Sequence, residues 1–253
     1  MLRVDDVSMS FGGVQALSSF SIQLAPGVIA GLAGPNGSGK STLLNAISGF
    51  VAATGSVQVD GKQLRLRDPK AARRAGVMRT FQTPQLIDTI TCLENVLLAD
   101  EDRRATGLLM ACFGRPWMLA KEKRRWQRAL DALTAVGLRS LAAVPAQAIT
   151  FAERRRLELA RAIVADPKVV LLDEPTAGLN DAETAEFGEL LGSLMNDSIA
   201  VIIVDHKIDF LDSLCNEIVV LEQGRVIAHG TAAQVWADER VIDAYLGADH
   251  ADA

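Results

Sequence analysis

The stretch GPNGSGKS, residues Gly34–Ser41, decides the fold of this chain. It follows a short apolar run, VIAGLAG, and it opens a helical pattern, KSTLLNAISGF. Its three glycines let the backbone bend so that successive N–H groups point inward. Lys40 adds a mobile positive charge, and the helix that follows aims the positive end of its dipole at the same point. A strand, a glycine-rich turn and a helix in this order predict a loop that encloses phosphate groups.

The loop offers a different group to each part of a nucleoside triphosphate. Lys40 suits the β and γ phosphates, and the Ser41 hydroxyl suits Mg²⁺, which prefers oxygen ligands. We therefore expect a nucleoside triphosphate and Mg²⁺ as cofactors. The other residues that we expect to bind the nucleotide here are Gly34, Pro35, Asn36, Gly37, Ser38, Gly39 and Thr42.

A second run, VVLLDE at Val169–Glu174, places two acids at the end of an apolar strand. An acidic pair at a strand end is commonly no more than exposed charge. In open α/β sheets, however, ligands bind at the carboxyl edge, and the phosphate loop favours a functional pair. We expect Asp173 to hold Mg²⁺ through water and Glu174 to polarise an attacking water molecule.

The bulk composition narrows the class of protein. The 253 residues are 49% hydrophobic and 23% charged, which is typical of a globular chain, and the net charge of -5 does not favour nucleic acid. Cys92, Cys112 and Cys215 lie far apart, which argues against a disulfide framework or a zinc site. Neither a signal peptide nor an apolar run long enough for a membrane span is evident. These observations predict a soluble intracellular protein that could still dock onto a membrane protein.

Strand and helix patterns alternate along most of the chain, and helical patterns dominate residues 83–148. They predict an α/β fold: a P-loop NTPase core with a mostly parallel sheet, an N-terminal antiparallel β region and an inserted helical subdomain. The expected boundaries are 1–82 for the first part of the core with the P-loop, 83–165 for the helical subdomain, and 166–253 for the remainder of the core.

The order and spacing of these motifs resemble those of ATP-binding subunits of ABC transporters over nearly the whole chain. RTFQTP contains Gln82 at the position of the glutamine switch, and VDH contains His206 at the histidine switch. AGLN stands in the loop where subunits of that family meet. FGGVQAL, GVMRTFQ, AGLN and VIDAYLG are further similar to importers of branched-chain amino acids and their relatives for urea and amides.

The resemblance implies a role for each matched residue. Phe11 would stack on adenine, Gln82 would sense the Mg²⁺ side of the γ-phosphate, and His206 would hold the γ-phosphate and Glu174. With Lys40 and Glu174, the two switch residues form the expected catalytic set, and Gln82 joins Ser41 and Asp173 as a metal contact. The alternatives are a packed phenylalanine at a strand end, an ordinary surface glutamine and a structural histidine.

The signature of the family, roughly L-S-G-G-Q, is altered in this chain. Thr150 keeps the hydroxyl, but Ala152 adds a methyl group where the backbone approaches phosphate, and Glu153 adds a negative charge. Thr150 and Glu153 also fit a capping box at the start of a helix, and the arginines at 154–156 could offset the carboxylate. Because signatures act on the ATP of the opposite subunit, we expect a heterodimer with two unequal sites. The five altered positions are Ile149, Thr150, Phe151, Ala152 and Glu153.

The implied partners are a second ABC ATPase subunit, two membrane-spanning permease subunits and an external solute-binding protein, with no nucleic acid. The implied location is the cytoplasmic face of the inner membrane. TPQLIDTITCLENV would lie near the coupling helix of a permease. RPWMLAKEKRRWQRALDAL predicts a basic amphipathic helix with Trp126, Leu130 and Leu133 over a small core, with membrane docking as the alternative. A weakly hydrolysing regulatory subunit and a non-transport ABC ATPase are the alternative functions.

Overall fold

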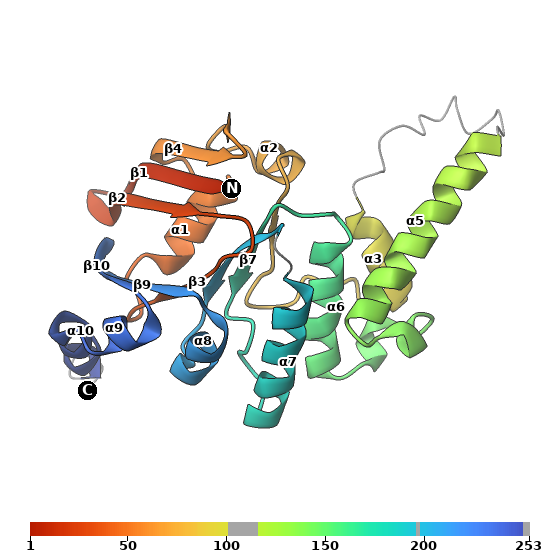
Figure 1. Ribbon diagram of the computed structural model, residues 1–253. Helices are drawn as coiled ribbons and strands as arrows, with labels where there is room; N and C mark the ends of the chain where they lie inside the picture. Colours follow the sequence, from red (N-terminus) through yellow and green to blue (C-terminus); the bar gives the residue numbers. More distant parts are fainter. Residues whose placement is uncertain (101–115, 196–197, 250–253) are drawn as a thin grey trace. The chain divides into compact units, whose positions relative to one another are not determined.

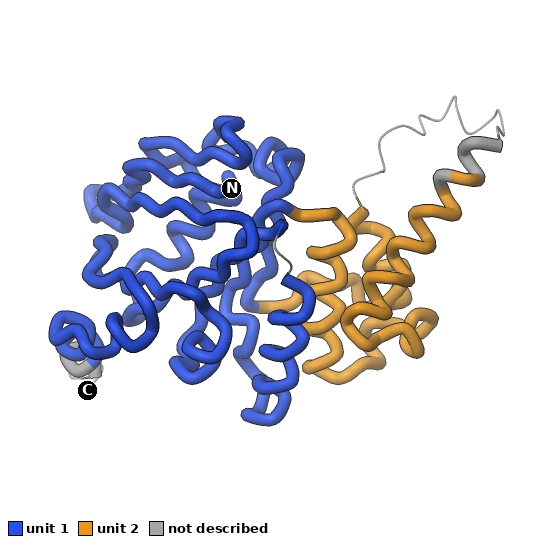
Figure 2. The backbone as a smooth tube through the Cα atoms, in the orientation of Figure 1, with its two compact units in different colours: residues 1–82, 168–253 blue, residues 83–167 orange. Residues whose placement is uncertain are grey.

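The computed structural model describes residues 1–100, 116–195 and 198–249 (Figure 1). Contacts divide the chain into two compact units, one formed by residues 1–82 with 168–253 and the other by residues 83–167 (Figure 2). Cys112 lies outside the described residues. The first unit contains both sheets and the second is helical, so the predicted fold class is confirmed.

The first sheet is antiparallel and has the strand order β2-β1-β4-β5. Buried and exposed residues alternate along much of β1, as expected for a sheet with one covered face. Asp60 and Gly61 form the predicted hairpin turn, and both have positive φ, which matches a two-residue loop between twisted strands. The strands are β1 Leu2–Phe11, β2 Val14–Leu24, β4 Thr54–Val59 and β5 Lys62–Gln63.

The second sheet has the order β10-β9-β3-β8-β7-β6, and only β10 of these described strands runs antiparallel to its neighbour. Every residue of β3, β7 and β8 is buried, and runs such as AVIIV in β8 suit a strand covered on both faces. The strands are β3 Ile29–Ala33, β6 Val77–Arg79, β7 Val169–Asp173, β8 Ala200–Val204, β9 Glu217–Glu222 and β10 Arg225–Gly230.

Helix α1 (Lys40–Ile47) packs in the hydrophobic core that the two sheets share. Leu43, Leu44 and Ile47 are almost completely buried in this core. Burial of three aliphatic side chains contributes roughly 1.5–3 kcal/mol each, so the helix that follows the phosphate loop is firmly anchored. The other helices of this unit are α2 Pro69–Arg74, α7 Asp181–Leu194, α8 Ile208–Leu214, α9 Ala232–Trp236 and α10 Glu239–Asp249.

The described part of the second unit is built on three helices, α3 (Cys92–Ala99), α5 (Pro116–Ala135) and α6 (Phe151–Ile163), with short 3₁₀ turns at Arg139–Leu141 and Ala146–Ala148. Leu133 is fully buried as predicted, whereas Trp126 is 42% exposed. Among the α5 residues whose burial the structure describes, the buried ones start at Ala129, one turn later than the sequence suggested. The Trp126 indole stays at the surface, where its N–H donates to Glu122 Oε1 at 3.2 Å.

Strand register brings the predicted site residues to one edge of the second sheet. Leu32 of β3 and Asp173 of β7 both pair with Val204 of β8. The phosphate loop follows β3, the acid pair ends β7, and His206 stands two residues beyond β8. The carboxyl ends of three adjacent parallel strands therefore form the floor of the site.

Candidate functional site

The phosphate loop is fixed by glycines that tolerate no side chain. Gly34 has φ +137°, and a Cβ there would lie 2.1 Å from the carbonyl oxygen of Leu221. Gly39, which caps α1, has φ +107°, and its Cβ would lie 2.5 Å from the carbonyl oxygen of Ala16. The loop thus owes its shape to close backbone contact with neighbouring strands and loops, which a residue with a side chain could not make.

The C-terminal helix also reaches this loop. The backbone N–H of Gly34 donates to the Tyr245 hydroxyl at 2.9 Å, across 211 residues of sequence. Burial raises the pKa of the Tyr245 hydroxyl, so it stays a neutral partner at ordinary pH. The first N–H of the loop is therefore held by a side chain of α10.

Lys40 is buried at the base of the loop, with 6% of its surface exposed. Its ammonium donates to the carbonyl oxygens of Gly34 at 2.7 Å and Pro35 at 2.9 Å. Burial lowers the pKa of Lys40, while the nearby charges of Glu174 and Asp173 oppose that shift. A partly desolvated ammonium that two carbonyl groups hold in place is well suited to bind phosphate oxygens.

A cavity of about 170 Å³ lies next to Lys40, which is one of its lining residues. Residues from the loop, from the first turn of α1 and from the ends of β7 and β8 line it together, so three separate motifs of the sequence meet there. The lining residues are Ala16, Asn36, Gly37, Ser38, Gly39, Lys40, Ser41, Thr42, Glu174 and His206.

The Glu174 carboxylate is held by both predicted switch residues. Gln82 Nε2 donates to Glu174 Oε2 at 2.7 Å, and His206 Nε2 lies 3.2 Å from Glu174 Oε1. A carboxylate only accepts, so His206 carries a proton on Nε2 in this contact. Glu174 has φ +46°, an unusual backbone conformation for a glutamate, and such conformations concentrate at functional sites.

Asp173 points to a different partner. Its Oδ2 accepts from Arg79 Nη2 at 2.8 Å, and both side chains are almost fully buried. Nothing in the sequence pointed to a role for Arg79. In the sequence, Arg79 is only a basic residue at the end of a short predicted strand. That pattern does not show which strand will lie beside it in the sheet.

Phe11 ends β1 and is not among the residues that line the cavity. Its side chain is 53% exposed, which contradicts the alternative of a packed phenylalanine at a strand end. An exposed ring beside a Gly12-Gly13 turn can offer a face to a planar ligand. Stacking of adenine on Phe11 stays a prediction.

Asp205 joins the loop after β7 to the loop after β8. Its buried carboxylate accepts from the backbone N–H of Thr176 at 3.1 Å and from the Thr176 hydroxyl at 2.8 Å. It also accepts from the backbone N–H groups of His206 and Lys207 at 2.8 and 3.0 Å. In the sequence Asp205 stood out only as a neighbour of His206, although it fixes the backbone on both sides of the site.

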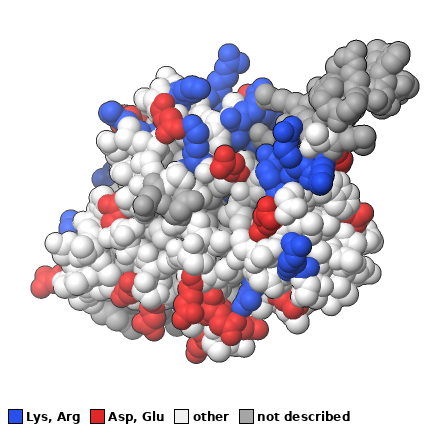
Figure 3. Space-filling view, turned by 45° about the vertical axis from the view of Figure 1, so that its right-hand side comes forward, with Lys and Arg blue, Asp and Glu red and all other residues white. Residues whose placement is uncertain are grey.

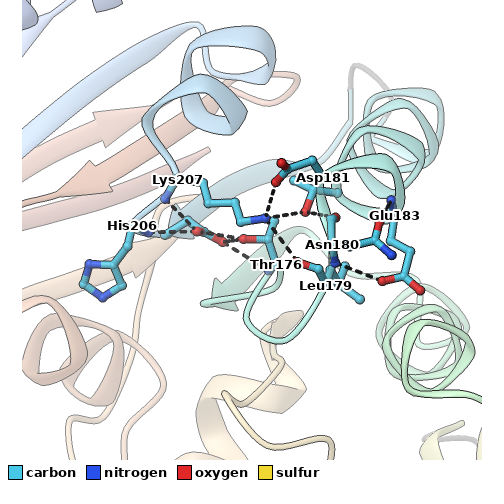
Figure 4. Close-up of polar contacts among 9 residues, drawn as sticks. Thr176, Leu179, Asn180, Asp181, Glu183, His206 and Lys207 are labelled. Carbon is cyan, nitrogen blue, oxygen red and sulfur yellow. Dashed lines mark hydrogen bonds and ion pairs between the residues drawn. The ribbon is translucent and has the colours of Figure 1, made fainter.

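Lys207 extends the same network toward α7 (Figure 4). Its ammonium donates to the Leu179 carbonyl at 3.2 Å and to the Thr184 hydroxyl at 2.9 Å, and it lies 3.3 Å from Asp181 Oδ1. The His206 ring points away from these contacts in Figure 4. The predicted subunit-contact loop AGLN is thus tied to the residue that follows His206.

The altered signature lies in the second unit, at the start of α6. Thr150 and Glu153 form the predicted capping box: Glu153 N donates to Thr150 Oγ1 at 3.3 Å, and Thr150 N donates to Glu153 Oε2 at 2.7 Å. Ala152 is partly buried, and Phe151 is 44% exposed. The Arg154 guanidinium donates to the Ala146 carbonyl and to Asp88, and an offset of the Glu153 charge by the arginines at 154–156 stays a prediction.

A larger hollow of about 890 Å³ lies along α7 and α8 and shares His206 with the first cavity. Its lining includes Gly188, Gly192 and Phe210 and contains no phosphate-binding loop. Size alone therefore does not identify the site, and the chemistry of the lining favours the smaller cavity.

Comparison with known families gives two matches. The family described as ABC transporter matches residues 17–177, and the family described as branched-chain amino acid ATP-binding cassette transporter matches residues 225–251. The chain is also similar to the high-affinity branched-chain amino acid transport ATP-binding protein LivG of Escherichia coli K12. The two are 34% identical over 98% of each chain.

Solved structures of ATP-binding cassettes are also similar to this chain. An ATP-binding cassette of an ABC transporter in its ADP conformation superposes with a TM-score of 0.83 at 28% identity, over 98% of both chains. A dimeric cassette in a post-hydrolysis state, bound to ADP and phosphate, superposes with a TM-score of 0.73 at 26% identity, over 92% of this chain and 99% of that one. In the described part of the chain, no helix is both long enough and apolar enough to cross a membrane.

Proposed function

This chain belongs to the ABC transporter family as an ATP-binding and ATP-hydrolysing motor subunit, and we propose that it drives the import of branched-chain amino acids or related small polar solutes. The substrate class is supported by the family match over residues 225–251 and by the name of the relative LivG. The similarity to LivG extends over 98% of each chain, so it also includes the segments that flank the nucleotide site. This extent supports the same class of transported solute.

The cavity next to Lys40 is the proposed ATP site. The single observation that carries this assignment is the meeting of the phosphate loop, Glu174 and His206 around one cavity. Lys40 and the loop N–H groups would bind the β and γ phosphates, and Ser41 and Thr42 line the cavity at the start of α1. Phe11 would contact the adenine ring from outside this cavity.

The donor groups fit Mg²⁺. Among the described residues, no cluster of three or more His, Cys, Asp or Glu side chains could hold a metal alone, so phosphate oxygens would have to complete the shell. Ser41, Asp173 and Gln82 supply the hydroxyl, carboxylate and amide oxygens that a hard cation prefers. When bound, Mg²⁺ would neutralise part of the charge on the phosphates.

Glu174 is the proposed group that orients water for attack on the γ-phosphate. Gln82 and His206 each contact one of its oxygens, which fixes the plane of the carboxylate. The His206 side chain is 47% exposed, so it can turn toward a phosphate without disturbing the buried core. Positioning of this kind supplies most of the catalysis in phosphoryl transfer to water.

Replacement of Glu174 by glutamine tests this role. Glu174→Gln should still bind ATP but hydrolyse it about 10²-fold to 10⁴-fold more slowly, the usual contribution of a general base. Glu189→Gln, an exposed glutamate on α7, is the matched control and should leave turnover unchanged. Undiminished hydrolysis in Glu174→Gln would remove Glu174 from this role.

The altered signature supports a heterodimer with a related ATPase subunit. Thr150, Ala152 and Glu153 would face the ATP of the partner, where the methyl group and the carboxylate are unfavourable next to phosphate. Glu153 is engaged in the capping box, which favours a local structural role for it. If Ala152→Gly combined with Glu153→Gln leaves the rate of single-turnover hydrolysis by the reconstituted transporter unchanged, the signature of this chain is not impaired.

The proposed assembly places this subunit at the cytoplasmic face of the inner membrane, with two membrane-spanning permease subunits and an external solute-binding protein. Figure 3 shows lysine and arginine side chains gathered in the upper part of the view, with a few acidic ones among them, and acidic side chains gathered at its lower edge. The net charge of -5 does not favour nucleic acid as a partner. Co-purification from native membranes would identify the associated polypeptides.

A further inference from the structure

Arg79 connects three elements of the proposed ATP site. It ends β6, and its Nη2 donates to Asp173 Oδ2 at the end of β7 at 2.8 Å. Its Nη1 donates to Asn45 Oδ1 at 2.6 Å and to Ser48 Oγ at 3.2 Å, at the carboxyl end of α1 and at the residue that follows it. One guanidinium therefore joins Asp173 to the helix that begins at Lys40.

The surroundings of Arg79 leave it little freedom. Its side chain is 7% exposed, and the guanidinium carbon lies 5.1 Å from the centre of the Phe81 ring. Phe81 in turn packs edge-on against Phe50 at 6.0 Å. The Nε of Arg79 is buried and has no hydrogen-bond partner among the described residues. The position of the side chain therefore satisfies its two terminal nitrogens but leaves the third nitrogen unsatisfied.

The planar guanidinium is suited to this geometry. Its two terminal nitrogens point in fixed directions, one toward Asp173 and one toward Asn45, whereas a lysine would have to make both contacts from a single nitrogen. A buried ion pair is by itself weak evidence for added stability, because desolvation offsets much of its attraction. Orientation of the carboxylate is the better account of this arrangement.

We infer that Arg79 is a positioning residue that fixes Asp173 with Oδ2 engaged, so that the other carboxylate oxygen is presented to magnesium-bound water. The inference rests on the proposed ATP site. Three residues further along the chain, Gln82 donates to Glu174. The segment 79–82 thus sets the orientation of both acids of the pair.

The test measures ADP binding by the full-length chain over a range of Mg²⁺ concentrations and in EDTA, by calorimetry. Arg79→Met and Arg79→Lys should each raise the half-saturating Mg²⁺ concentration by about tenfold or more, because loss of a group that orients a metal ligand typically costs 10–100-fold in metal affinity. ADP affinity in EDTA should stay within about twofold of the unmodified chain, because Arg79 does not line the cavity. Arg74→Met, an exposed arginine on α2, is the matched control and should change neither value.

The outcomes distinguish a positioning role of Arg79 from an effect of its charge alone and from a loss of folding. An unchanged Mg²⁺ requirement in a folded Arg79→Met chain would overturn the inference, and so would normal behaviour of Arg79→Lys, since charge alone would then suffice. If Arg79→Met does not fold, Asn45→Ala removes only the contact with α1. It should shift the Mg²⁺ requirement in the same direction by a smaller factor, and no shift would overturn the inference. Absence of ADP binding by the unmodified chain would instead overturn the proposed function, and this inference with it.

Discussion

Replacement of Asp205 should show how strongly the two loops at the carboxyl edge depend on one buried carboxylate. In Asp205→Ala, the N–H and hydroxyl of Thr176 lose their acceptor inside the protein, and the N–H groups of His206 and Lys207 lose theirs near the surface. A buried donor without a partner costs about 1–3 kcal/mol, and a donor that water can reach costs less. We expect the free energy of unfolding to fall by about 3–5 kcal/mol, at the upper end of single substitutions.

Asp205→Asn separates the hydrogen bonds from the shape of the side chain. The amide oxygen can still accept from His206 and Lys207, but the amide nitrogen then faces the N–H of Thr176. The expected loss is about 1–2 kcal/mol, from one unsatisfied contact and the weaker neutral acceptor. Asp243→Ala, at an exposed position of α10, should cost less than about 0.5 kcal/mol and serves as the control.

Urea-induced unfolding followed by circular dichroism would measure these differences, provided that the slope of the transition stays the same in all variants. A loss below about 1 kcal/mol in Asp205→Ala would refute the reasoning, because four donors would then have found other partners. Equal losses in Asp205→Ala and Asp205→Asn would also refute it, since the amide would have supplied nothing.

Three further outcomes follow from the structure. Lys40→Ala should weaken nucleotide binding by at least about tenfold in calorimetry while the fold is kept, because in the described part of the chain the ammonium donates to two loop carbonyls; unchanged affinity would exclude the cavity as the ATP site. Gly34→Ala should cost about 3 kcal/mol or more in urea unfolding, since its Cβ would lie 2.1 Å from a carbonyl oxygen, whereas Gly37→Ala meets no atom within 4 Å and should cost about 1–2 kcal/mol of backbone strain; equal costs would contradict the close contact at Gly34. Burial raises the pKa of the Cys215 thiol to about 12, so iodoacetamide at pH 9 should label native Cys215 at least about a hundredfold more slowly than the unfolded chain, as mass spectrometry of the peptide would show. Equal labelling rates in the native and unfolded chain would contradict the raised pKa of Cys215. Because the folded-state pKa lies above the unfolded value, this thiol favours the folded state below about pH 9 and loses that contribution as pH rises toward 12.

Local signals in the sequence predicted the elements that depend on local physics. The glycine-rich turn at Gly34–Ser41, the Asp60-Gly61 hairpin and the capping box at Thr150 are each determined by residues within a few positions of one another. The carboxyl edge of the parallel sheet followed from strand–helix alternation. Each of these features was therefore accessible without knowledge of distant contacts.

The contacts that the sequence did not reveal join segments far apart in the chain. Arg79 meets Asp173 across 94 residues because β6 lies beside β7, and the strand order cannot be derived from periodicity. Asp205 meets Thr176 across 29 residues for the same kind of reason. The exposure of Trp126 differs from the prediction because spacing defines a stripe on a helix but does not set where burial begins along it.

The hydrogen bond between Gly34 and Tyr245 has a practical consequence for experiments on the carboxyl terminus. Affinity tags, truncations and chimaeras made at that end alter a segment whose tyrosine hydroxyl accepts a hydrogen bond from the first amide of the ATP loop. A shortened chain that omits the last helix would present a catalytic centre with one restraint missing, and exchange of tails between relatives would transfer part of the loop's support along with the tail.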